Sequence, residues 1–223
     1  MDYEDLSKWY SNLIFEMDLA DYTSDELSLF WDRKNYYGKY LSKYSRYFFL
    51  NHFARNLVTT INYFFDTNHS NVRYLEIGYG CGNQLLLMAL LGADVVGCDI
   101  RQDVCDLTKK RKKFYEKISG RDLNISLICE NVFNVNWETL GEFDAINFLF
   151  SFNELKPYEK MFELIEMLLK SGGRVVFQET NQSNYYNRIF RKRNSLLPHE
   201  MTIALKRYNF KIYSLQGGYA VPP

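Results

Sequence analysis

The residues most capable of chemistry stand together in one short turn. The segment Leu75-Glu76-Ile77-Gly78-Tyr79-Gly80-Cys81-Gly82-Asn83 has three glycines at alternate positions. Because glycine has no Cβ, the backbone of such a loop can approach a ligand closely where the next helix begins. The loop predicts a nucleotide-like cofactor.

Two details of this turn distinguish it from a dinucleotide site. A dinucleotide fingerprint has a glycine three positions after its second one, and Asn83 stands there instead. Glu76 lies two residues before the first glycine, where its carboxylate would repel a pyrophosphate. A ligand with an ammonium and a sulfonium and no phosphate, such as S-adenosylmethionine, suits that position. The turn therefore disfavours NAD.

Polar side chains also follow the next two predicted strands. Asp99 closes the run Val95-Val96-Gly97-Cys98-Asp99, 21 residues beyond Gly78. A carboxylate there can accept hydrogen bonds from both hydroxyls of a ribose. Asn131 follows the third strand, so its side-chain carbonyl can accept from an adenine amino group while the Val132 amide serves the ring nitrogen.

The elements that position these residues alternate from residue 72 onward. Short apolar runs alternate with helical stretches, which predicts an α/β fold with a doubly wound, mostly parallel sheet. The predicted helices are 84–91, 102–118, 157–170, closed by Ser171-Gly172-Gly173, and 198–208. The predicted strands are 72–77, 93–98, 124–129, 143–150, 174–178 and 210–215.

Residues 1–70 have a different pattern, with apolar side chains at helical spacing. Two or three helices are expected here, one of them beginning at Thr23, which has an acid three positions later. We expect 1–70 to form a helical N-terminal cover and 71–223 to form the cofactor-binding domain. The stripes are Leu6, Trp9, Tyr10, Leu13, Ile14 and Phe49, Phe53, Leu57, Ile61, Phe64.

Five segments in order resemble the class I S-adenosylmethionine-dependent methyltransferases of the small-molecule type, which have a Rossmann-like fold. They are LEIGYGCG (75–82), VVGCD (95–99), ENVF (130–133), FDAINFLFSFNEL (143–155) and LLKSGGRVVFQET (168–180). The family's sheet has a seventh, antiparallel strand. This chain ends soon after the sixth predicted strand, so either the sequence stops short or the sheet closes differently.

The resemblance implies a cofactor site, residue by residue. Asp99 would hold the ribose and Ile100 would pack on the adenine. Asn131, where the family usually has Asp, would keep adenine recognition without the charge. The backbone carbonyl of Phe150 would receive the amino group of the cofactor. The methionine part would be lined by Glu76, Gly78, Tyr79, Gly80 and Gly82.

Catalysis by methyl transfer requires mainly alignment of the nucleophile with the methyl group, so a general base is not obligatory. If a base acts, it is expected beyond the ends of strands four and five, where open α/β sheets bind ligands. Glu154 is the first candidate. His199 is the second, because the ordinary pKa of histidine suits proton removal near neutrality.

Composition limits the range of partners. Lys plus Arg and Asp plus Glu are 27 each, so the net charge is zero and long-range attraction to nucleic acid or anionic lipid is weak. The run Lys109–Lys113 and a second basic stretch at 188–193 keep RNA as an alternative, although the former is expected to be a solvated helix face. The resemblance would require an Asn/Asp-Pro-Pro-Tyr motif after strand four in a methyltransferase that acts on base amino groups of DNA or RNA, and this sequence has none there.

The remaining features indicate a protein of the cytoplasm. Four cysteines have no metal-ligand spacing and are read as reduced thiols, so no metal is expected. The N-terminus lacks a signal peptide, and no apolar run is long enough to span a bilayer. The oligomeric state is not indicated.

The sequence therefore predicts an enzyme that transfers a methyl group from S-adenosylmethionine, by in-line displacement, to an O, N or C nucleophile of a small molecule. Two alternatives stay open: an RNA methyltransferase, and an S-adenosylmethionine-binding module without catalysis.

Overall fold

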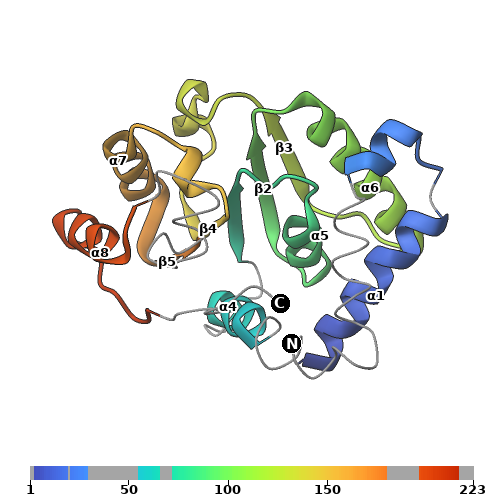
Figure 1. The fold of residues 1–223 in the computed structure, drawn as a ribbon, viewed down its shortest axis with the longest axis horizontal. Coiled ribbons are helices and arrows are strands. Elements are labelled where there is room, and N and C mark those ends of the chain that lie inside the picture. Colours follow the sequence, from blue (N-terminus) through green and yellow to red (C-terminus); the bar gives the residue numbers. More distant parts are fainter. Residues whose placement is uncertain (1–2, 20, 30–54, 66–71, 180–195, 216–223) are drawn as a thin grey trace, which may run out of the picture.

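A five-stranded parallel sheet forms the centre of the molecule (Figure 1). The computed structural model describes residues 3–19, 21–29, 55–65, 72–179 and 196–215. The strand order is β3-β2-β1-β4-β5, and every neighbouring pair is parallel, as predicted for a doubly wound fold. The strands are β1 (Arg73–Ile77), β2 (Asp94–Asp99), β3 (Ile125–Cys129), β4 (Phe143–Leu149) and β5 (Leu169–Gln178).

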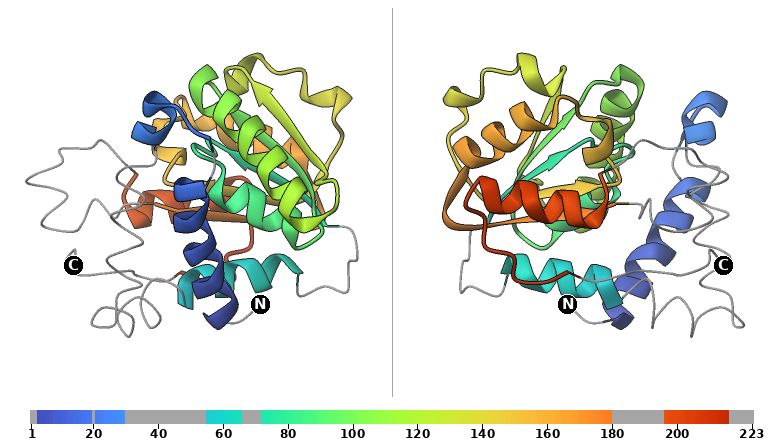
Figure 2. Two further views of the ribbon diagram at one scale, coloured as in Figure 1. Left: turned by 90° about the vertical axis from the view of Figure 1, so that its right-hand side faces the viewer. Right: turned by 60° about the vertical axis from the view of Figure 1, so that its left-hand side comes forward.

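Helices cover both faces of this sheet (Figures 1 and 2). One face carries α1 (Tyr3–Leu19), α4 (Arg55–Phe65), α5 (Asn83–Leu90) and α6 (Gln102–Ser119), and the other carries α7 (Tyr158–Leu168) and α8 (Pro198–Arg207). Three short 3-10 turns follow β3 and β4: η2 (Val132–Asn134), η3 (Trp137–Thr139) and η4 (Phe152–Glu154). None of the helices in the described ranges combines the length and hydropathy needed to cross a bilayer.

Successive strand residues point to opposite faces, so both layers of core come from the same five strands. Tyr74 of β1 lies opposite Val95 and Ala145, and all three join the core under α1, α4, α5 and α6. The next residue, Leu75, joins the core under α7 and α8. Burial on both faces explains why the strands read as continuous apolar runs.

The N-terminal helices have the apolar stripes that the sequence predicts. In α1 the residues Leu6, Trp9, Tyr10 and Leu13 are buried, and in α4 so are Leu57, Ile61 and Phe64; Phe49 and Phe53 lie outside the described residues. A helical segment at 24–29 begins at Thr23 as predicted. Thr23 Oγ1 accepts a hydrogen bond from the Glu26 amide at 3.2 Å, and a Glu26 carboxylate oxygen accepts one from the Thr23 amide at 2.7 Å. These two reciprocal bonds form a capping box.

The predicted sixth strand is wrong, because residues 210–215 form no strand. At the end of α8, Asn209 is left-handed (φ 58°) and the Phe210 amide donates back to the Leu205 carbonyl at 2.9 Å. The chain then passes toward α4, where the rings of Tyr213 and Tyr63 lie 6.1 Å apart. This path directs the segment away from the ladder of β5 (Figure 1).

The end of the predicted helix 157–170 also differs. Ser171-Gly172-Gly173 falls within β5 as an irregular insertion, because Phe143 pairs with Leu169 whereas Ala145 already pairs with Arg174. A left-handed Gly172 (φ 77°) lets the extra residues turn out of the ladder. Strand β5 therefore begins directly after α7, five residues earlier than the sequence predicts.

Close packing of α5 against β2 generates a test of the fold. A Cβ on Gly97 would lie 2.2 Å from Leu85 Cδ1 and 2.8 Å from Tyr79 Cδ1. We expect Gly97→Ala to lower the free energy of unfolding by about 1–3 kcal/mol through overpacking, measured by urea denaturation. The same substitution in a Leu85→Ala background should be less damaging, and an equal loss in both backgrounds would contradict this packing.

Candidate cofactor and active site

The candidate site lies where the strand order reverses. Strand β1 has β2 on one side and β4 on the other, and open α/β sheets bind ligands at the carboxyl ends of the strands at such a point. Gly78 follows β1 and Ser151 closely follows β4. Gly78 is left-handed (φ 72°), and a Cβ on it would lie 2.5 Å from Ser151 Cβ. Only glycine fits between these two strand ends.

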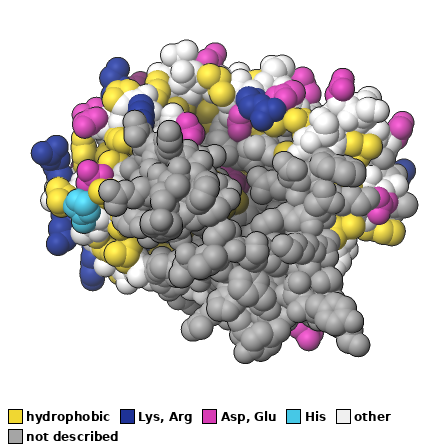
Figure 3. Space-filling view, in the orientation of Figure 1, with side chains coloured by type: hydrophobic (Ala, Val, Ile, Leu, Met, Phe, Trp, Pro, Cys, Tyr) yellow, Lys and Arg dark blue, Asp and Glu magenta, His cyan; other side chains and the backbone are white. Residues whose placement is uncertain are grey.

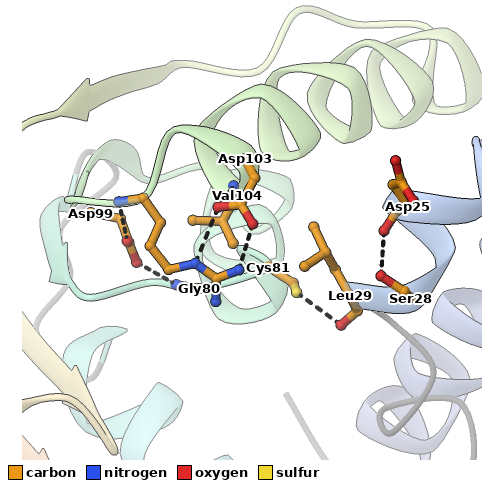
Figure 4. A network of polar contacts seen from close by, with 9 residues as sticks. Asp25, Ser28, Leu29, Gly80, Cys81, Asp99, Asp103 and Val104 are labelled. Atoms are coloured by element: carbon orange, nitrogen blue, oxygen red, sulfur yellow. Dashed lines mark hydrogen bonds and ion pairs between the residues drawn. The ribbon is translucent and has the colours of Figure 1, made fainter.

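Asp99 is held against the glycine loop. One carboxylate oxygen accepts the Gly80 amide at 3.0 Å, and the other accepts the Arg101 amide at 3.0 Å (Figure 4). A carboxylate has about four lone-pair sites, so both oxygens retain capacity for further donors such as ribose hydroxyls. The two backbone contacts fix the carboxylate at the tip of β2, next to the loop.

Glu76 is buried at the end of β1 and is only 1% exposed. Its carboxyl group accepts a hydrogen bond from the Tyr74 hydroxyl at 3.3 Å. Burial raises the pKa of Glu76 to about 8, since the charged form loses its hydration, and the nearby Asp99 carboxylate acts in the same direction. A cationic ligand group brought near this carboxyl would lower that pKa again.

Two loop residues of the predicted site act chiefly through the backbone. The Tyr79 side chain is buried and its hydroxyl lies 3.0 Å from Cys105 Sγ, so this residue can offer a ligand only its backbone. Gly82 is left-handed (φ 71°) and caps α5, with space for no Cβ because Thr108 Cγ2 would lie at 2.8 Å. The remaining glycine, Gly80, is left-handed too and has open space around it.

The residues predicted to hold adenine flank β2 and β3. Ile100 is 67% exposed directly after Asp99, which leaves an apolar surface free to pack on a flat ring. Asn131 caps η2, and its Oδ1 accepts the Phe133 amide at 3.0 Å. That oxygen therefore already has one partner. The Val132 side chain is buried, so the residue can offer only its backbone.

Phe150 has an unusual conformation at the end of β4. Its φ is 57°, which a non-glycine residue adopts only when its surroundings hold it. The Phe150 amide donates to the Gln178 carbonyl at 2.8 Å, which extends the ladder between β4 and β5 by one residue. The side chain is 44% exposed.

A carboxylate that the sequence analysis did not single out organises the other end of the site. Glu179 follows β5 and accepts the Phe152 amide at 2.6 Å and the Asn153 side-chain amide at 2.7 Å. Asn153 Oδ1 in turn accepts the Leu196 amide at 3.3 Å, just before α8. The loop after β4 and the start of α8 are thereby tied together.

The two candidate bases lie on the segments that this contact joins. Glu154 is the last residue of η4 and His199 the second residue of α8, and both side chains are exposed. No hydrogen bond or ion pair links Glu154 to His199 in the described part of the chain. The structure therefore brings their backbones to one end of the sheet without pairing their side chains.

The basic run of α6 is not the uniform solvated face that its sequence predicts. Arg111 is completely buried, paired with Glu16, while Lys110 pairs with Glu26 at 2.7 Å. Lys109 and Lys112 also have carboxylate partners, Asp106 and Glu116. Across the face in Figure 3, acidic and basic side chains are interspersed over the described surface. The second basic stretch, 188–193, lies outside the described residues.

The sequence analysis did not single out several residues that shape the site, because no local sequence pattern indicates their contacts. Ser151 and Glu179 lie inside matched segments but far from the glycine loop in sequence. The Arg111 guanidinium contacts the Cys81 carbonyl and donates to Asn83 Oδ1 at 2.7 Å. An arginine among four lysines is the only hint of such a role.

The raised pKa of Glu76 predicts how stability depends on pH. The folded chain keeps this proton to about pH 8, whereas the unfolded chain releases it near the ordinary value of 4.5. The contribution is therefore fully present below pH 4.5 and is lost as pH rises to about 8. Between pH 5 and 8, Glu76→Gln should remove a decline on the order of 3 kcal/mol in unfolding free energy.

The measurement is a series of urea titrations across this pH range on the protein without ligand. Glu163→Gln, at an exposed position of α7, is the matched control and should keep the pH dependence of the wild type. An unchanged slope in Glu76→Gln would contradict the assignment of the buried proton.

The comparisons with known proteins agree with this arrangement. A family model described as a methyltransferase domain matches residues 49–215, well over half of the 223-residue chain. No curated protein matches the chain by sequence.

Solved structures with the same fold include three of different activity. The [4+2]-cyclase SpnF superimposes with a TM-score of 0.58 at 18% identity, over 72% of this chain and 58% of the cyclase. Magnesium protoporphyrin IX methyltransferase from Synechocystis PCC 6803, with bound S-adenosylmethionine, gives 0.54 at 13%, over 72% and 70%. Phosphoethanolamine N-methyltransferase 2 from Haemonchus contortus, with S-adenosylhomocysteine, gives 0.53 at 19%, over 73% and 39%.

At these identities the three structures show a shared fold, and the chain spans little more than half the length of the first. The match to the family model goes further, because it covers the glycine loop, both carboxylate-bearing strand ends and the strands beyond them. The chain belongs to the family defined by this methyltransferase domain.

Proposed function

We propose that this protein binds S-adenosylmethionine at the carboxyl ends of β1, β2 and β4 and transfers its methyl group to a small molecule. The observation that carries the proposal is the glycine loop closed on the switch point, with Gly78 against Ser151 and the loop amide of Gly80 on Asp99. Family membership and the cofactors in the two methyltransferase structures support it.

The residues present fit this cofactor. Two carboxyl groups, those of Glu76 and Asp99, lie near the carboxyl ends of the adjacent strands β1 and β2. Two carboxylates there would repel a pyrophosphate, and they suit a ligand with positive charge and ribose hydroxyls. A Cβ on Gly78 would clash with Ser151, whereas Gly80 has open space around it, so the left-handed loop leaves its backbone open to a ligand at Gly80. Exposed Ile100 supplies an apolar surface for a purine.

When bound, S-adenosylmethionine supplies a methyl group that moves to the acceptor as the carbon–sulfur bond breaks and its electron pair stays on sulfur. The contribution of the chain is then to orient. Asp99 is fixed by two backbone amides, and the loop by Gly78 packed against Ser151, so the site is preorganised. A proton lost by the acceptor can pass to Glu154 or His199, or to water.

A small acceptor agrees better with the surface than RNA does. The carboxylates beside Lys109, Lys110, Arg111 and Lys112 compensate the basic run that motivated the RNA alternative. We further propose that residues 1–70 act as a cover over the site and 71–223 as the cofactor-binding domain. The four free thiols fit a reducing compartment, the cytoplasm.

One observation favours a second candidate, a protein that binds the cofactor without transferring its methyl group. The cyclase SpnF shares the fold, and its name describes a cycloaddition rather than a methylation. Exposed and unpaired Glu154 and His199 leave no assembled base in the described residues. Cofactor binding is common to both candidates, and turnover separates them.

Binding is tested by thermal shift with S-adenosylmethionine, S-adenosylhomocysteine and NAD. At about a hundred times its dissociation constant, each adenosyl compound should add roughly 2.7 kcal/mol and raise the midpoint by roughly 5–10 °C. NAD should give no shift. Asp99→Ala should lose most of the shift and Glu163→Gln should keep it. An equal shift with NAD, or none with the adenosyl compounds, would refute the proposed cofactor.

Turnover is tested by transfer of a labelled methyl group to a metabolite library. Labelled product from the wild type supports the enzyme, and cofactor binding without product from any acceptor supports the second candidate. If Glu154 removes the proton, Glu154→Gln should lower kcat by roughly 10²–10⁴-fold with little change in cofactor affinity. A kcat within two-fold of the wild type would remove Glu154 from this role, and His199→Ala is read in the same way.

A further inference from the structure

Arg111 connects the N-terminal helix to the back of the glycine loop. Its side chain is fully buried in α6. Two of its nitrogens donate to the two carboxylate oxygens of Glu16 in α1, both at 2.8 Å. The third contacts the Cys81 carbonyl and Asn83 Oδ1, which are the last turn of the loop and the first residue of α5.

We propose that Arg111 is a positioning residue for the cofactor loop, and that its position depends on α1 being docked. The helix α1 would then regulate cofactor affinity from behind the loop, in addition to any covering role. This inference rests on the proposed function, because it assigns a control element to that same site.

The electrostatics make the two contacts interdependent. Burial opposes the charge of Arg111, but the Glu16 carboxylate outweighs it and holds the pKa of the guanidinium above its ordinary range. Burial likewise opposes the charge of Glu16, and Arg111 holds the pKa of that carboxyl below its ordinary value. Removing either partner leaves a buried charge uncompensated, which is far more damaging than loss of a surface pair.

Further contacts extend the connection on both sides. The Glu16 carboxylate also accepts hydrogen bonds from the Tyr22 hydroxyl at 2.6 Å and the Tyr115 hydroxyl at 2.8 Å. These donors, together with Arg111, fix the orientation of the carboxylate. Beside it, Cys81 Sγ lies 3.5 Å from the Leu29 carbonyl at the end of the 24–29 helix (Figure 4). The N-terminal segment thus contacts the glycine loop at a second point.

Coupling of this kind is reciprocal. If docked α1 favours the loop geometry that binds the cofactor, then bound cofactor must favour docked α1 by the same factor. Amides of α1 should therefore exchange hydrogen more slowly when S-adenosylhomocysteine is bound. A merely structural ion pair would not transmit occupancy of the site to residues 3–19.

The experiment measures S-adenosylhomocysteine affinity by calorimetry and α1 protection by hydrogen exchange on the full chain. Asn83→Ala removes the side-chain half of the loop contact, and leaves both the Cys81 carbonyl contact and the pair with Glu16 in place. Arg111→Lys keeps the charge but cannot span both partners. We expect each to weaken affinity roughly 5- to 20-fold, and Asn83→Ala to reduce the ligand-dependent protection of α1 at saturating ligand.

Glu26→Gln is the matched control. Glu26 pairs with Lys110, the neighbour of Arg111, and joins the same N-terminal segment to the same helix without contacting the loop. Glutamine preserves the capping box with Thr23, so affinity should stay within two-fold of the wild type. Glu16→Gln completes a double-mutant cycle with Asn83→Ala. In the Glu16→Gln background, Asn83→Ala should weaken S-adenosylhomocysteine affinity by a smaller factor than in the wild type.

The outcomes separate this inference from the proposed function. Two outcomes would overturn the coupling and leave the cofactor assignment standing. In one, the wild type binds S-adenosylhomocysteine but α1 protection does not change; in the other, the affinities of Asn83→Ala and Arg111→Lys both stay within two-fold of the wild type. Absence of S-adenosylhomocysteine binding by the wild type overturns the proposed function, and the coupling with it.

Discussion

A buried arginine that cannot lose its proton requires a counter-charge, and in this protein that requirement joins distant parts of the chain. Arg111 sits in α6, its carboxylate partner Glu16 comes from α1, and its remaining donor reaches the glycine loop. An apolar contact between α1 and the sheet would allow small shifts at little loss, whereas a fork-to-fork pair with further tyrosine donors fixes one arrangement. The cofactor loop is built on that arrangement.

The second constraint is the reversal of strand order at β1. Strands on both sides of the switch point carry their loops away from each other, which opens the carboxyl end of the sheet. Left-handed backbone on both sides, at Gly78 and Phe150, brings those loops into contact without filling the opening. Glycine accepts this conformation at no steric loss, whereas Phe150 is held by its hydrogen bond to Gln178.

Shared architecture leaves the reaction to be decided by residues at the periphery. The same fold is found in a cyclase, in a magnesium protoporphyrin IX methyltransferase and in a phosphoethanolamine N-methyltransferase, all below 20% identity with this chain. Those names describe different reactions and substrates around a common fold. In this protein Glu179 holds the loop after β4, and that loop in turn contacts the start of α8 at the same end of the sheet.

The sequence alone determined the parallel sheet, its first five strands, the capping box at Thr23 and the cofactor loop, because these depend on local periodicity and on glycine spacing. It could not determine the sixth strand: the alternation at 210–215 satisfies a strand pattern, but the cap after α8 directs the chain toward α4. Nor could it distinguish Arg111 from its lysine neighbours. Only tertiary structure places Glu16, 95 residues earlier, against that guanidinium, since burial and charge pairing are properties of the packed chain.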